Sequence, residues 1–222
     1  MVDWVSLCGG EWAEKLKPTL GDRYWTELGA FVEECSSDDQ VKPPLDLICA
    51  ALRHTPPSEV RVVIVGQDPY PTDSHANGLA FAVSGGTVPQ TLKNIFKELN
   101  CDVCVPIPDG GDLEPWALRG VLLLNAALTF REGDSARHWR MWKPFTDSVV
   151  RIAEESDPVF ILWGQVAQKK VLAVIDEKRR MVIKSPHPAQ KAARTGFFGS
   201  KPFSRTNQAL ISATGRGIDW TL

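Results

Sequence analysis

The sequence lacks an excess of positive charge: its 222 residues include 25 Lys and Arg against 27 Asp and Glu, for a net charge of −2. This balance argues against a protein that coats nucleic acid through bulk charge. The sequence also has no apolar run of membrane-spanning length, no basic leader followed by an apolar core, and no repeat or low-complexity tract. We therefore expect residues 1–222 to form a single soluble domain that works in the cytoplasm, away from membranes.

Cysteine is scarce as well. The five cysteines form an odd, scattered set, which is consistent with reduced thiols in a cytosol. Cys101 and Cys104 have the spacing of a metal-ligand pair, but no second pair lies at a suitable distance to complete the four thiolates of an iron–sulfur cluster.

No Gly-rich phosphate loop follows any expected strand, which argues against an unrelated nucleotide-binding α/β protein.

What the sequence does contain is an apolar run, Val60–Val65, that stops at the loop Gly66–Pro71. Consecutive β-branched residues before a Gly predict a buried parallel strand. Within the loop, Pro69 and Pro71 have no N–H groups and restrict the residues before them, which favours extended conformations at Asp68 and Tyr70. A carboxylate and an aromatic ring are therefore held on a stiff loop at the carboxyl end of a strand, where open α/β sheets bind ligands.

Strand and helix patterns alternate along the rest of the chain. Residues 1–59 are predicted to be mainly helical, with one helix around Tyr24–Val32 and a short one around Leu45–Leu52. Further strands are predicted at Val121–Leu124, Pro158–Trp163 and Met181–Lys184, and helices at Leu92–Leu99, Pro144–Glu155, Val166–Ile175 and Ser204–Ala213. This alternation predicts an α/β fold, a three-layer sandwich with a central four-stranded parallel sheet and helices on both faces.

Polar side chains follow each of the four predicted strands. Asp68, Asn125, Gln165 and His187 lie just past the apolar runs, so a parallel sheet brings all four to one edge. Taken singly, Asp and Asn at such places are ordinary turn residues, and Phe81 in its apolar segment is an ordinary core residue. His187 is different, because the prolines on both sides of it fix its backbone, and this serves orientation more than packing.

Two features point to an anionic partner. From Lys178 to Arg205 the chain carries eight basic residues and no acidic one, although a solvated surface face is the commoner explanation of such a run. The helix at 92–99 follows a Pro turn, and we expect Thr91 or a neighbour to cap it. A capped helix N-terminus can bind phosphate, but every capped helix has these features, so this indication is weak.

Together these segments resemble family-1 uracil-DNA glycosylases. The matching motifs are Gly66-Gln67-Asp68-Pro69-Tyr70, Leu122-Leu123-Leu124-Asn125-Ala126, Leu162-Trp163-Gly164 with Ala167-Gln168-Lys169-Lys170, and His187-Pro188 followed by Gly196-Phe197-Phe198-Gly199. They occur in the family's order. The resemblance implies a monomeric single-domain enzyme without metal or cofactor. It also implies the reaction: hydrolysis of the N-glycosidic bond of deoxyuridine in single- or double-stranded DNA, which releases free uracil.

The resemblance also implies roles for individual residues. Asp68 orients the attacking water and His187, as a neutral imidazole, binds uracil O2. Gln67, Tyr70, Phe81 and Asn125 form the uracil pocket. Thr91, Gln165 and Ser185 lie where the family holds the DNA backbone. Lys191 and Arg194, in the loop after His187, are our own candidates for further DNA contacts. A small DNA-mimicking inhibitor protein is known for the family and is a possible partner.

The chain departs from the family pattern at several positions. Pro71 stands where many members have His, Gln90 interrupts the usual Pro-Pro-Ser turn, and Gln165 replaces a small hydroxyl residue. The largest departure is Lys191, which occupies the place of a Leu that wedges into the duplex. We hypothesise that Lys191, with Arg194, replaces apolar wedging by charge, which would increase salt sensitivity, favour single-stranded substrate and weaken the inhibitor.

Two alternatives stay open. The first is a DNA-binding module that keeps the fold without turnover; the presence of both Asp68 and His187 argues against it, because binding alone needs no water-orienting carboxylate. The second is a related iron–sulfur uracil-DNA glycosylase, which the missing second cysteine pair disfavours.

Overall fold

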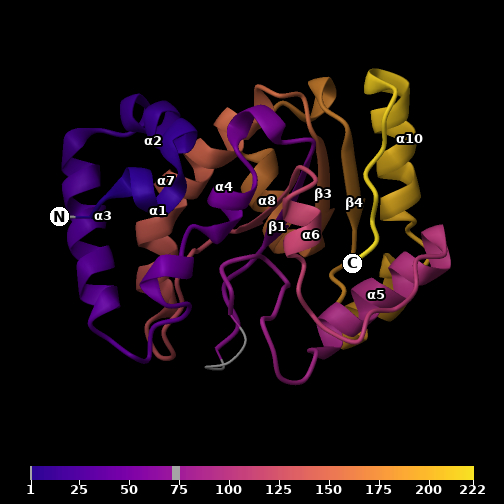
Figure 1. Cartoon of the computed structure of the whole chain (residues 1–222), viewed down its shortest axis with the longest axis horizontal. Coiled ribbons are helices and arrows are strands. Elements are labelled where there is room, and N and C mark those ends of the chain that lie inside the picture. The colour runs from indigo at the N-terminus through magenta and orange to yellow at the C-terminus, as the bar shows by residue number, and fades with distance from the viewer. Residues whose placement is uncertain (1, 72–75) are drawn as a thin grey trace.

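Four parallel strands form the centre of the molecule in the order β2-β1-β3-β4 (Figure 1). They are β1 (Val62–Gly66), β2 (Val121–Asn125), β3 (Val159–Trp163) and β4 (Val182–Ser185). The computed structural model describes residues 2–71 and 76–222. The predicted parallel sheet is confirmed, and each expected strand lies within two residues of its predicted bounds at either end.

The burial of the strands follows their sequences. Every residue of β1, β2 and β3 is buried, as their continuous apolar runs require, whereas the edge strand β4 exposes Lys184. The register pairs Gly66 with Asn125 across β1 and β2, and Trp163 with Ser185 across β3 and β4. Since all the strands are parallel, their carboxyl ends meet at one edge of the sheet.

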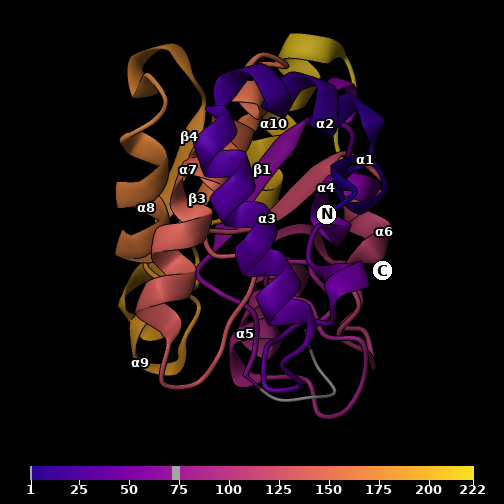
Figure 2. The ribbon, with the colours of Figure 1, turned by 90° about the vertical axis from the view of Figure 1, so that its left-hand side faces the viewer.

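Helices cover both faces of this sheet (Figures 1 and 2). On one side lie α7 (Ser135–Glu154) and α8 (Gly164–Leu172), with the N-terminal group of α1 (Trp4–Cys8), α2 (Gly10–Leu16) and α3 (Asp22–Ser36) outside α7. On the other side α10 (Pro202–Thr214) packs on β3 and β4, and α5 (Gln90–Val103) contacts α10. The short helices are α4 (Ala50–His54), α6 (Glu114–Ala117) and α9 (Gln190–Ala192).

The helix predicted to begin at Pro144 begins nine residues earlier, and Pro144 lies in its interior. A proline there disrupts the backbone hydrogen bonds of a helix. The Tyr24 hydroxyl of α3 binds the helix beside this proline: it donates to the Met141 carbonyl at 2.6 Å and accepts from the Phe145 N–H at 3.2 Å. One phenol thus bridges two backbone groups of α7 in the turn that contains Pro144.

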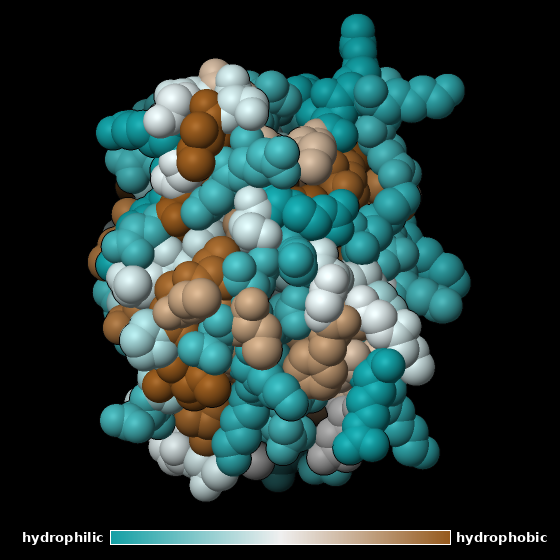
Figure 3. All heavy atoms as spheres, turned by 90° about the vertical axis from the view of Figure 1, so that its right-hand side faces the viewer, coloured by the Kyte–Doolittle hydropathy of each residue, from teal (hydrophilic) through white to brown (hydrophobic). Residues whose placement is uncertain are grey.

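Smaller differences concern the other helices. The short helix predicted around Leu45–Leu52 is a 3₁₀ turn at Leu45–Leu47 followed by α4, and α8 begins and ends two to three residues before its predicted bounds. Within the described parts of the chain, no helix combines the length and apolar character needed to cross a membrane. The face that carries α5 and α10 is largely hydrophilic, with apolar side chains scattered among polar ones (Figure 3).

Candidate active site

The loops that leave β1 and β2 run side by side past the edge of the sheet. The carbonyl groups of Gly66 and Gln67 accept hydrogen bonds from Ala126 and Ala127, each at 3.0 Å. A Cβ atom at position 66 would lie 2.5 Å from Oδ1 of Asn125. The missing side chain of Gly66 therefore makes room for the Asn125 amide, which is only 4% exposed.

Phe81 and His187 come from distant segments and meet at this edge, with ring centroids 6.0 Å apart and planes tilted by 45°. Phe81 adopts a left-handed backbone conformation with φ of 67°, which is unusual for a large side chain. Its ring packs edge-on against Trp163 at 5.3 Å, and its carbonyl accepts a 3.4 Å hydrogen bond from the Tyr70 hydroxyl. These contacts hold the Phe81 ring in place despite the backbone strain.

The imidazole of His187 has a defined hydrogen-bonding state. The Ala189 N–H donates to Nδ1 at 3.0 Å, so Nδ1 is an acceptor and the neutral ring carries its proton on Nε2. Burial lowers the pKa of His187, which favours this neutral form. The ring therefore offers one N–H donor, at Nε2.

Asp68 and Tyr70 are half-buried on the stiff loop after β1. Burial raises the pKa of Asp68, while the nearby Gln67 amide, whose Nε2 lies 3.5 Å from Oδ2, acts in the opposite direction. Burial also raises the pKa of Tyr70 to about 12, so its hydroxyl stays protonated. The edge of the sheet thus combines a carboxylate, a neutral imidazole, a buried amide and aromatic rings.

Comparison with known proteins shows the family to which the chain belongs. Residues 52–211 match the family model described as the uracil DNA glycosylase superfamily. The chain is 45% identical to uracil-DNA glycosylase 2 of Streptomyces coelicolor, over 98% of this chain and 97% of the relative.

The chain belongs to the uracil-DNA glycosylase superfamily.

Solved structures of this superfamily have the same fold. The mimivirus uracil-DNA glycosylase is 26% identical, with a TM-score of 0.77 over 100% of this chain and 94% of that chain. A variant of mimivirus UNG in complex with UGI is also 26% identical, with a TM-score of 0.76 over 99% of this chain and 95% of that chain. The three-layer architecture predicted from the sequence is therefore that of uracil-DNA glycosylases.

The residues predicted to contact DNA come from different elements of this superfamily member: Ser185 ends β4, Gln165 lies in α8, Thr91 lies in α5, and Lys191 and Arg194 follow His187. Gln165 is exposed at the start of α8, and Lys191 and Arg194 are exposed in the segment after His187. Ser185 is buried, and its hydroxyl donates to the Pro186 carbonyl at 3.0 Å.

The prediction that Thr91 or a neighbour caps α5 with its side chain is wrong. The helix starts at Gln90 after Pro89, and no side chain caps it. Thr91 lies inside the first turn of α5 and is half-buried, so it does not occupy the N-cap position.

Several residues that shape the site had no role in the sequence-based prediction. Gly164 begins α8 with φ of +85°, and a Cβ atom there would lie 2.9 Å from Cβ of His187. The Trp163 ring packs against the Phe81 ring, and Asn94 of α5 binds the segment after His187. The Leu-Trp-Gly motif pointed to the first two, but nothing in the periodicity of α5 distinguishes Asn94.

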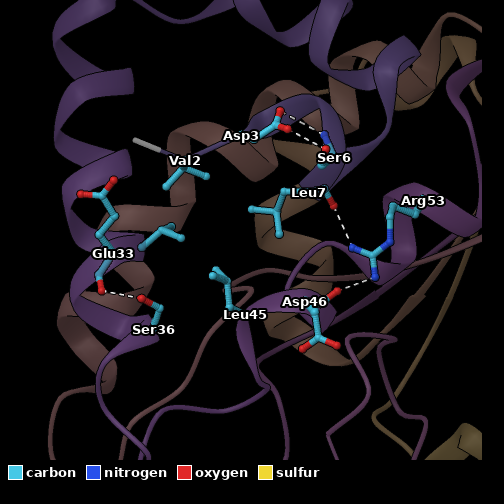
Figure 4. A pocket seen from close by; sticks show the side chains of 10 residues that line it. Val2, Asp3, Ser6, Leu7, Glu33, Ser36, Leu45, Asp46 and Arg53 are labelled. Atoms are coloured by element: carbon cyan, nitrogen blue, oxygen red, sulfur yellow. Dashed lines mark hydrogen bonds between the residues drawn. The ribbon is translucent and has the colours of Figure 1, made fainter.

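A hollow of ≈ 710 Å³ lies apart from this edge, between α1, α3 and the 3₁₀ turn at residues 45–47 (Figure 4). None of the predicted site residues lines it. The guanidinium of Arg53 donates to the carbonyls of Leu7 and Asp46, so it joins the backbone of these two segments. The hollow is therefore separate from the set of predicted site residues.

Proposed function

We propose that this chain removes uracil from DNA by hydrolysing the N-glycosidic bond between the base and its deoxyribose, and so starts base excision repair. The observation that carries the proposal is the approach of Phe81 and His187, with ring centroids 6.0 Å apart, at the edge that also holds Asn125 and Asp68. A base inside a duplex cannot reach such a site, so the uracil nucleotide must be flipped out of the stack.

The pocket residues select uracil by shape and hydrogen bonding. Phe81 offers a flat ring on which the base stacks. The Asn125 amide donates to uracil O4 and accepts from N3–H, whereas cytosine would leave these buried groups mismatched. Tyr70, held between Pro69 and Pro71, stands against C5 and excludes the methyl group of thymine. Gln67 contributes to the O2 side of the pocket.

The reaction separates charge, and two residues stabilise it. As the bond between C1′ and N1 breaks, negative charge gathers on the uracil and positive charge on the sugar. His187 donates from Nε2 to uracil O2, a contribution of about 3–4 kcal/mol for one oxyanion donor. Asp68, ionised, orients the water and faces the cationic sugar. Burial penalises the Asp68 charge before the reaction, and the same low-dielectric surroundings strengthen its attraction to the developing cation.

Contacts with DNA phosphates extend the site beyond the base. We assign Thr91, Gln165 and Ser185 to the backbone on either side of the flipped nucleotide. Lys191 and Arg194 are exposed on the segment that follows His187. A Lys at position 191 fills a gap in the base stack less well than an apolar wedge, but its charge attracts phosphates.

The proposal extends to partners and organisation. The substrates are uracil-containing single- and double-stranded DNA, and free uracil is a product. The enzyme works as a monomer, with residues 1–222 as one domain, in the cytoplasm, and needs no metal or cofactor. The solved complex of a mimivirus UNG variant with UGI supports an inhibitor protein as a further partner, and Lys191 is expected to weaken that interaction.

The test is a cleavage assay on oligonucleotides that carry a single U, T or C. We expect cleavage at U alone, with Asp68→Asn and His187→Leu each reducing the rate strongly. Binding of the U oligonucleotide without release of uracil would instead favour a DNA-binding module. Cleavage at T or C with similar rates would contradict the assigned pocket.

A further inference from the structure

One peptide group connects α5 to the imidazole of His187. The carbonyl of Pro188 accepts a hydrogen bond from Nδ2 of Asn94 at 2.7 Å. The N–H of the same peptide group, which belongs to Ala189, donates to Nδ1 of His187 at 3.0 Å. Because a peptide group is planar, fixing its carbonyl also fixes the direction of its N–H.

The amide of Asn94 is itself held in one orientation. Its Oδ1 accepts from Nε2 of Gln90, one turn earlier in α5, at 3.0 Å. Asn94 is only 8% exposed and Pro188 is buried, so water cannot readily replace either partner. Gln90 therefore turns the Asn94 amide so that its N–H₂ group faces the Pro188 carbonyl.

We propose that Asn94, oriented by Gln90, is a positioning residue for His187 that keeps the imidazole proton on Nε2. The proposal rests on the proposed function, in which that Nε2–H binds uracil O2. Hydrogen bonds in a chain polarise one another, so donation by Asn94 to the Pro188 carbonyl strengthens the bond that the Ala189 N–H makes to Nδ1. Without Asn94 the peptide group loses its anchor, and the ring can place its proton on either nitrogen.

This role differs from that of a hydrogen bond that only attaches α5 to the loop. Such a hydrogen bond would affect the stability of the fold but would not change which nitrogen of the imidazole carries the proton. A positioning residue affects the chemical step: kcat falls, while the KM for DNA, which depends on contacts made elsewhere, changes little.

The experiment compares Asn94→Ala, Gln90→Ala and Asn100→Ala in the full chain. Asn100 is the matched control, because its amide also donates from α5 to a backbone carbonyl, that of Val105 at 3.0 Å, but at the other end of the helix. We measure kcat and KM on a uracil-containing single-stranded oligonucleotide, and the ¹⁵N NMR signals of the His187 ring, assigned with His187→Leu.

For Asn94→Ala we expect a fall in kcat of about tenfold or more, with KM little changed, because a displaced catalytic group loses rate steeply. The NMR spectrum should show partial protonation of Nδ1 in the neutral ring. Gln90 is exposed, so Gln90→Ala should fold normally; it should lower kcat by about threefold in the same direction. Asn100→Ala should behave as the wild type.

Unchanged His187 signals in Asn94→Ala, or equal kcat in all three variants, would overturn the proposal. Should Asn94→Ala fail to fold, Gln90→Ala decides, since wild-type kcat and ring signals there would remove the basis for an oriented Asn94. A wild-type protein that leaves the oligonucleotide intact would refute the proposed function instead, and the NMR comparison would still show whether Asn94 controls the imidazole proton.

Discussion

Gly164 and His187 lie in direct backbone-to-side-chain contact: a Cβ atom built at position 164 would sit 2.9 Å from Cβ and 3.2 Å from Cδ2 of His187. The backbone at the start of α8 thus packs directly against the imidazole, and only a glycine fits at position 164. Any side chain there must push His187 out of the orientation that the Ala189 N–H imposes.

Gly164→Ala is therefore expected to lower kcat by about tenfold or more. Gly164 also has φ of +85°, so the variant loses some stability through backbone strain. Gly199→Ala is the matched control, because Gly199 has φ of +81° but no atom within 4 Å of an added Cβ. Gly164→Ala should lose at least as much stability as Gly199→Ala in thermal unfolding, and only Gly164→Ala should lose activity. Equal activity of the two variants would contradict the role of the contact.

Gly66→Ala should displace the Asn125 amide, which we assign to the uracil pocket. The new methyl group would lie 2.5 Å from Oδ1 of Asn125 and 2.9 Å from Cβ of Ala80, so the Asn125 amide must move. We expect kcat/KM on the U oligonucleotide to fall by about 100-fold. Gly29→Ala in α3, where nothing lies within 4 Å, should keep full activity. Retention of wild-type kcat/KM by Gly66→Ala would show that the Asn125 amide does not need this position.

Lys191→Leu should change how activity depends on salt. Removing one phosphate-attracting charge is expected to reduce the slope of log(kcat/KM) against log[salt] on duplex DNA by about 0.9, and to raise the ratio of duplex to single-strand activity. The measurement is a salt series on both substrates. Lys17→Leu, at an exposed lysine next to α2, is the control and should keep the wild-type slope. An unaltered slope and ratio in Lys191→Leu would leave no role for its charge.

Asp68→Asn should stabilise the protein at neutral pH while strongly reducing its activity. Burial raises the pKa of Asp68 above its ordinary value of 3.8, so the folded state binds this proton more tightly than the unfolded state. The charged carboxylate therefore destabilises the fold at neutral pH, and this effect disappears as the pH falls below 3.8, where both states are protonated.

Thermal unfolding of Asp68→Asn at neutral pH and below pH 3.8 tests this sign. Asp219→Asn is the opposite control: hydrogen bonds from Thr221 lower the pKa of Asp219, so its carboxylate stabilises the fold at neutral pH and this gain is lost on acidification. A Tm of Asp68→Asn at or below that of the wild type at neutral pH would be the contrary result.

Tyr24→Phe should weaken the fold without touching the site. The variant leaves the Met141 carbonyl and the Phe145 N–H without the hydroxyl that joins them beside Pro144. We expect the free energy of unfolding in urea to fall by about 1–3 kcal/mol, with kcat unchanged. Ser36→Ala removes an exposed hydroxyl of the same helix and should stay within about 0.5 kcal/mol of the wild type. Similar losses in both variants would argue against the bridge.

The sheet, and the edge at which its strands end, could be predicted because both depend on local sequence. The apolar runs that end at Gly66, Asn125, Trp163 and Ser185 are long enough to define strands, and parallel pairing alone brings the following residues to one edge. The contacts that tune the site depend on distant residues instead. Asn94 and Pro188 are 94 positions apart, and nothing near either of them indicates the other.

The same reason explains the error at Pro144. A proline is a good marker of a helix start when only its neighbours are considered. Here α7 continues through it, and a hydroxyl from a residue 121 positions before Phe145 binds the backbone beside the proline. Such a long-range contact leaves no trace in the local pattern.

The bridge at Tyr24 also sets a limit on how far this enzyme can be shortened. None of the predicted site residues comes from the N-terminal helices, so α3 is an obvious candidate for removal in a minimal version of the protein. Yet the Tyr24 hydroxyl of α3 binds two backbone groups of the long helix α7, and α7 packs against α8, the helix that begins at Gly164 beside His187. Truncation of the first 36 residues would thus destabilise α7, although every predicted site residue would remain in the chain.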